Sequence, residues 1–146
     1  MKKLIFSVLT LAFIGLVSPI QAQKSGDAET IFKKHINKMV ESVEKAETPD
    51  AKREVLNGSF DDLIGAIEKV ESMKAIPETD KEGLKVFKAD IQDKQNELNG
   101  VNGFSPVANN NLNNFANFVQ QDFEQADKVT IGITTLLLII LILILI

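Results

Sequence analysis

The side chains with the clearest capacity for chemistry are a single histidine, His35, and scattered acids. His35 stands one helical turn after Ile31 and one turn before Met39, at the edge of an apolar stripe. A helical bundle can bind haem between a histidine and a methionine. His35 and Met39 fall on the same helix, so they cannot bind opposite faces of one iron. The spacing favours a hydrogen-bonded boundary histidine, and a small-ligand or haem-type carrier bundle is the alternative.

The acidic residues form pairs, Asp61 with Asp62 and Asp90 with Asp93, but they lack a metal-binding pattern. A carboxylate metal site in a bundle needs Glu and Glu-x-x-His motifs that project inward from several helices. The sequence has no Glu-x-x-His and no G-x-S-x-G motif around a nucleophilic serine. We therefore predict no enzyme activity, no catalytic or metal-binding residues and no cofactor.

The charge and the cysteine content of the chain exclude further classes of partner and site. The net charge is −4 and Arg53 is the only arginine, whereas nucleic-acid binding needs clustered basic residues. We therefore exclude nucleic acid as a partner. The absence of cysteine excludes disulfides, thiolate metal sites and thiol nucleophiles.

Asparagine is concentrated in residues 109–117, although it is a poor helix former. Such a segment could form an uncharged contact surface or a ladder for self-association, and polar filler is the simpler interpretation. Asn57-Gly58-Ser59 is an N-x-[ST] sequence, which would matter only in a eukaryotic secretory pathway.

The first 22 residues have the organisation of a secretory signal. A basic start, Lys2-Lys3, precedes the apolar stretch Leu4–Val17, and Ser18–Ala22 ends on a small residue. We predict a signal peptide over residues 1–22 with cleavage after Ala22. An uncleaved membrane anchor is the alternative, but the apolar stretch is short for a span.

Residues 129–146 carry no charge and end in an unbroken run of Leu and Ile from Leu136. As a helix this block would be about 27 Å long, close to the roughly 30 Å of a hydrocarbon core. Exposure to water would cost more than the stability of a small domain. We expect a lipid bilayer to bury Val129–Ile146 as a single transmembrane helix. Burial by a protein partner or a second copy, or removal as a sorting tail, are the alternatives.

Four amphipathic helices are predicted between these ends, starting near residues 27, 49, 79 and 105. Apolar residues recur at i, i+3 and i+4 in each, and short breakers separate the helices. The second helix is expected to pass unbroken through Asn57-Gly58-Ser59, the third to begin with a capping box over 79–82, and the fourth with Ser105-Pro106. Expected core aromatics are Phe32, Phe60, Phe87, Phe115 and Phe123, with Phe118 near the seam.

These patterns predict an all-α chain: an antiparallel up-and-down four-helix bundle over residues 27–128, followed by a single C-terminal transmembrane helix over 129–146. We expect a single-pass protein of the bacterial cell membrane, with residues 23–128 on the periplasmic or extracellular side. The expected role is a non-enzymatic interaction or structural module of the cell envelope. Its expected partners are the lipid bilayer, through Val129–Ile146, and an envelope protein or a second copy of the chain.

Overall fold

The computed structural model describes residues 18–125 and 131–146, and all of its regular secondary structure is helical. The apolar stretch Leu4–Val17 of the predicted signal, and residues 126–130, lie outside the described residues. The elements are α2 (Ser18–Lys45), α3 (Pro49–Glu71), α4 (Glu78–Asn99), a 3₁₀ turn η1 (Asn109–Asn111), α5 (Leu112–Glu124) and α6 (Ile133–Leu145). The predicted all-helical bundle is confirmed.

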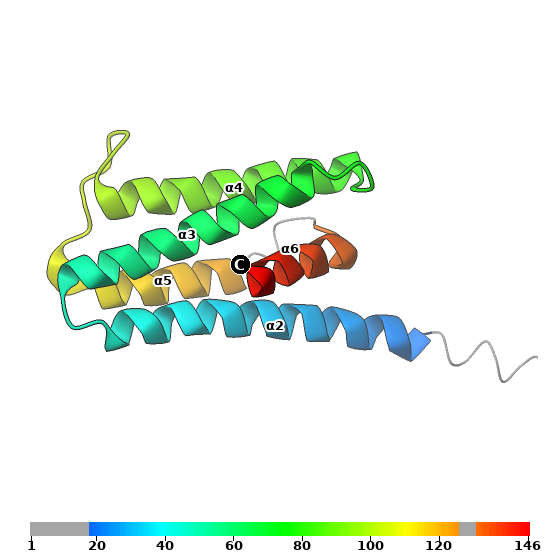
Figure 1. Ribbon diagram of the computed structural model, residues 1–146, viewed down its shortest axis with the longest axis horizontal. Coiled ribbons are helices and arrows are strands. Elements are labelled where there is room, and N and C mark those ends of the chain that lie inside the picture. Colours follow the sequence, from blue (N-terminus) through cyan, green and yellow to red (C-terminus); the bar gives the residue numbers. More distant parts are fainter. Residues whose placement is uncertain (1–17, 126–130) are drawn as a thin grey trace, which may run out of the picture.

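Helices α2 to α5 lie side by side and alternate in direction along the chain (Figure 1). The turn between α2 and α3 follows the predicted chemistry: the Thr48 side chain accepts a hydrogen bond from the Ala51 N–H at 3.2 Å, and Pro49 opens the helix. Helix α3 continues through Asn57-Gly58-Ser59, as predicted, because its buried stripe runs in phase on both sides of that triplet.

Two predicted helix starts and one predicted helix cap were wrong. Helix α2 begins at Ser18 rather than near residue 27, with Pro19 in its first turn, where a proline is tolerated. The expected capping box at the start of α4 does not form, because the N-cap residue is Pro77 and no side chain caps the helix. Helix α5 begins at Leu112, after η1, and not at Ser105-Pro106.

Pro106 packs in a loop instead of opening a helix. Gly100 ends α4 in a left-handed conformation with φ of 67°, and a Cβ there would lie 2.5 Å from the Pro106 Cδ. A residue without a side chain is therefore needed where the loop crosses the end of α4.

Arg53, the sole arginine, fixes this loop. Its Nη1 donates to the Leu98 carbonyl at 2.6 Å, and its Nη2 donates to the Val107 carbonyl and, at 3.2 Å, to the Asn109 Oδ1. The planar guanidinium can reach three acceptors at once, and it satisfies a carbonyl at the end of α4. No local sequence pattern predicts this role for Arg53.

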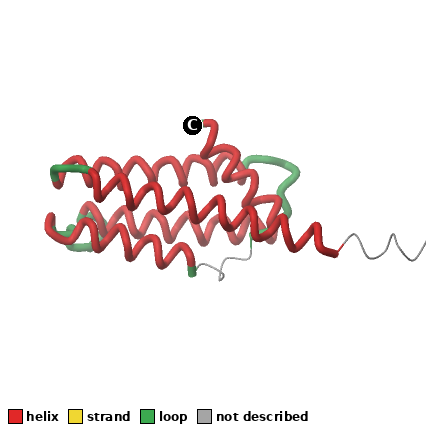
Figure 2. The backbone as a smooth tube through the Cα atoms, turned by 90° about the horizontal axis from the view of Figure 1, so that it is seen from below, coloured by secondary structure: helices red, strands yellow, loops and turns green. Residues whose placement is uncertain are grey.

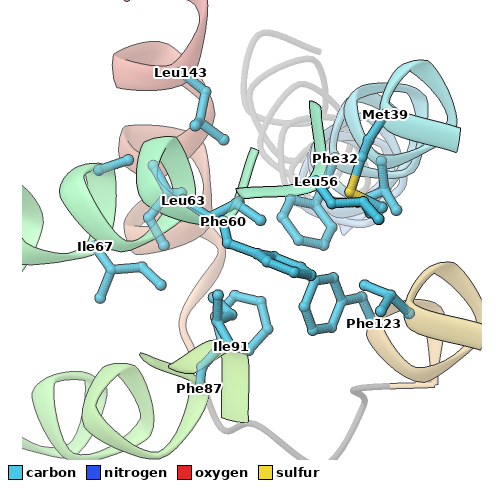
Figure 3. Packing of buried hydrophobic residues seen from close by; sticks show 14 of the residues in the cluster. Phe32, Met39, Leu56, Phe60, Leu63, Ile67, Phe87, Ile91, Phe123 and Leu143 are labelled. Carbon is cyan, nitrogen blue, oxygen red and sulfur yellow. The ribbon is translucent and has the colours of Figure 1, made fainter. Parts of the chain in front are cut away.

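Aromatic side chains from α2, α3, α4 and α5 meet in the core (Figure 3). The ring of Phe87 makes edge-to-face contacts with Phe32, at a centroid distance of 6.1 Å, and with Phe123, at 5.5 Å. Phe60 is fully buried among them. All five predicted core aromatics are buried, whereas Phe118 is about half exposed and lies beneath the Lys94 ammonium at 4.4 Å.

The carboxy-terminal segment departs most from the expected architecture. Helix α6 has 13 residues and packs against α2 and α3, with Ile139, Ile140 and Leu143 buried. At about 1.5 Å per residue it is roughly 20 Å long. None of the helices in the described part of the chain is both long and apolar enough to cross a bilayer. The predicted transmembrane helix is therefore not supported by the described residues.

Replacing Phe60 by alanine should lower the free energy of unfolding by about 3–5 kcal/mol, because the cavity lies in the centre of the core. Denaturant unfolding followed by circular dichroism measures the change. Val86→Ala is the control, since Val86 is 64% exposed and should change stability by less than about 0.5 kcal/mol. Equal effects of the two substitutions would mean that the core is assigned wrongly.

Arg53→Lys should destabilise the chain by about 1–3 kcal/mol, because an ammonium cannot contact all three acceptors in their fixed positions. Asn109→Ala removes only the exposed acceptor and should cost clearly less in the same unfolding measurement. A lysine variant as stable as the original would contradict the bridging role of the guanidinium.

Candidate functional site

His35 lies where the sequence placed it, on α2 at the edge of the core, and its side chain is half-buried. Burial lowers its pKa below the usual value, the Asp62 carboxylate on α3 opposes that shift, and Lys38 adds to it. No group of three or more potential metal ligands occurs among the described residues. The haem or metal interpretation of His35 therefore gains no further ligand from the fold.

The acidic pairs are separated by the fold. Asp61 and Asp62 are exposed, and Asp61 accepts a hydrogen bond from the Gln95 amide at 2.8 Å. Burial, together with the nearby Asp122 carboxylate, raises the pKa of Asp90. Of these carboxylates, Asp62 lies close enough to affect the pKa of His35, but the described residues contain no cluster of three or more potential metal ligands.

Polar side chains whose role the sequence did not decide form hydrogen bonds within the bundle. Ser59 on α3 and Ser72, which follows its last residue, donate to carbonyls of α3 at 2.9 and 2.7 Å. Asn57 exchanges amide hydrogen bonds with Asn99 on α4, at 2.7 and 3.1 Å. The N-x-[ST] sequence therefore lies in a helix with its asparagine in an interhelical contact.

The asparagine segment is used partly for structure. Asn109 accepts from Arg53, and Asn113 accepts from the Lys52 ammonium at 2.8 Å. The same ammonium donates to the Val43 carbonyl near the end of α2. Asn110, Asn111 and Asn114 are exposed and form the part of the segment that could contact a partner.

Helix α6 carries the candidate binding surface of this chain, an exposed apolar side. One side covers α2 and α3, and Figure 3 places Leu143 over Leu63 of α3. The opposite side is exposed and consists of leucine and isoleucine. We call this surface the outer face of α6, defined by Leu137, Leu141, Ile144 and Leu145, which are 37%, 52%, 68% and 76% exposed.

The start of α6 is fixed by one carboxylate. The Asp80 Oδ2, near the start of α4, accepts a hydrogen bond from the Gly132 N–H at 3.2 Å and a second from the Thr135 hydroxyl. A carboxylate is favoured there because the first amides of a helix lack partners and carry partial positive charge. Thr135 is 1% exposed, the only polar residue in the core of the described chain. We call these two hydrogen bonds the Asp80 contact.

Sequence reasoning missed the Asp80 contact because it treated residues 129–146 as one uniform block. The signal was present in Gly132, Thr134 and Thr135, which interrupt the apolar run where the helix begins. It did not identify the acceptor, which lies 52 positions earlier in the chain.

Comparison of the chain with models of protein families, with curated proteins and with solved structures finds no match.

The pKa of His35 should be below about 6.5, and Asp62→Asn should lower it further because a favourable negative charge is lost. At a pH between the pKa of His35 in the folded chain and its higher pKa in the unfolded chain, the unfolded chain binds more protons. The free energy of unfolding therefore falls as the pH drops below about 6.5. The single histidine can be titrated by NMR. Asp61→Asn is the control and should leave the titration close to the original; equal shifts would contradict the pairing with Asp62.

Proposed function

We propose that this chain is an exported, non-enzymatic helical-bundle module of the cell envelope that attaches to lipid through its carboxy-terminal segment. The observation that carries the proposal is the outer face of α6, an exposed surface of leucine and isoleucine on a helix without a single charge. A helix that is apolar on every side belongs in a protein core or in a membrane, and here only one side is covered.

The exposed apolar area of α6 favours contact with lipid. Fully burying a leucine or isoleucine side chain stabilises by about 1.5–3 kcal/mol, and four such side chains on the outer face are incompletely covered. Exposed apolar patches of this kind mark lipid or protein interaction sites. The 18 uncharged residues of the full segment also match the thickness of a hydrocarbon core when helical.

Charge favours a neutral lipid surface over an anionic one. The chain is acidic, with a net charge of −4, so anionic headgroups repel it. Attachment should therefore depend on apolar burial and change little with salt. The organisation of residues 1–22 supports export, and residues 23–128 would then lie on the periplasmic or extracellular side of a bacterial membrane.

The chain starting at Gln23 should sediment with phosphatidylcholine vesicles at both low and high salt. Leu141→Asp should reduce the bound fraction about tenfold or more, because a carboxylate is costly in an apolar layer. Val86→Asp is the matched control, since Val86 is exposed on α4, away from the proposed surface.

Equal binding of the Leu141 and Val86 variants would refute attachment through α6. A chain that stays out of the vesicle pellet and forms oligomers that Leu141→Asp dissociates would instead assign the outer face to a second copy. Analytical ultracentrifugation without vesicles makes that distinction.

A further inference from the structure

The aromatic contacts at the centre of the bundle do not involve α6. The aromatic series Phe32, Phe87 and Phe123 joins α2, α4 and α5. Helix α6 adds cover on the side of α2 and α3, and Figure 2 shows its carboxyl end projecting away from the other helices. The last residues, Ile144 to Ile146, are each more than 60% exposed.

The interactions that retain α6 are of two kinds. Apolar packing of Ile139, Ile140 and Leu143 covers α2 and α3, and a bilayer could cover the same side chains equally well. The polar interaction is the Asp80 contact. Among the described residues, the hydrogen bonds from α6 to other helices all end on that carboxylate.

A bilayer would cover more of α6 than the bundle does. In the bundle one side is buried and the outer face is exposed, whereas in lipid every side is covered. As a helix, the 18 uncharged residues from Val129 to Ile146 would be about 27 Å long, near the thickness of a hydrocarbon core. Burial of α6 itself therefore favours lipid, whereas the Asp80 contact and the cover that α6 gives to α2 and α3 favour the bundle.

We propose that α6 is a releasable helix: in water it packs on α2 and α3 and is retained by the Asp80 contact, and at a bilayer it leaves the bundle and inserts. This inference rests on the proposed attachment to lipid and specifies how it occurs. It also explains why α6 has the composition of a transmembrane helix and yet packs against α2 and α3.

Release is tested by a distance measurement on the chain starting at Gln23. Because the chain has no cysteine, Lys33→Cys on α2 and Ile146→Cys at the end of α6 accept spin labels at those two sites alone. Both positions are exposed. Pulsed electron paramagnetic resonance then gives the distance in buffer and with phosphatidylcholine vesicles, and sedimentation of the same samples gives the bound fraction.

Release predicts one short distance in buffer and a longer one in the vesicle pellet. Sedimentation with an unchanged distance overturns the release and leaves attachment intact, because the chain would then bind through the outer face of a docked α6. Failure to sediment overturns the attachment itself, and the release with it.

The retaining role of Asp80 is tested by a matched pair of threonine substitutions. Thr135→Val removes a hydroxyl that donates to Asp80, and Thr134→Val removes an exposed neighbouring hydroxyl with the same gain in apolar character. The Thr135 variant should be released at about tenfold lower lipid concentration than the Thr134 variant, as expected for a lost hydrogen bond to a charged group.

Asp80→Ala should shift release in the same direction, whereas Asp93→Ala, at an exposed acid on the same helix, should not. Circular dichroism of each variant in buffer confirms that the bundle is intact. Release at the same lipid concentration in both members of each pair would overturn the role assigned to Asp80.

Discussion

The structure depends on where the apolar surface of the carboxy-terminal segment is buried. Leucine and isoleucine from Leu136 to the end of the chain form a surface that water cannot accommodate without a large cost in free energy. The chain meets this constraint partly from within, because α2 and α3 cover one side of α6. The opposite side of α6 remains exposed, and exposed apolar patches on folded domains mark interaction sites.

Polar groups set the position of the helices in this bundle, while apolar packing supplies the cohesion. Arg53 connects the start of α3 to the end of α4 and to the following loop. Lys52 connects the start of α3 to the end of α2. Asp80 connects the start of α4 to the start of α6. In each case a charged side chain meets backbone groups at a helix terminus, where amides or carbonyls lack partners. These contacts satisfy backbone groups at the ends of α2, α4 and α6.

The interior offers little that resembles a reactive centre among the described residues. His35 is half-buried beside one carboxylate, and the serines on α3 and the following turn donate to backbone carbonyls. The outer face of α6, by contrast, has no partner within the described chain. We propose that the chain attaches to lipid through that face and that α6 exchanges between the bundle and the bilayer.

The sequence alone determined the number and order of the bundle helices, the continuity of α3 and the five core aromatics, because apolar periodicity and proline punctuation are local properties. It also identified the tail as a surface that must be buried. Only the tertiary structure decided that the tail starts a helix at Ile133 and turns back onto α2 and α3. Hydropathy measures how strongly a segment avoids water but is indifferent to whether lipid or protein replaces it, and the acceptor that fixes α6 lies on a distant helix, beyond the reach of any local pattern.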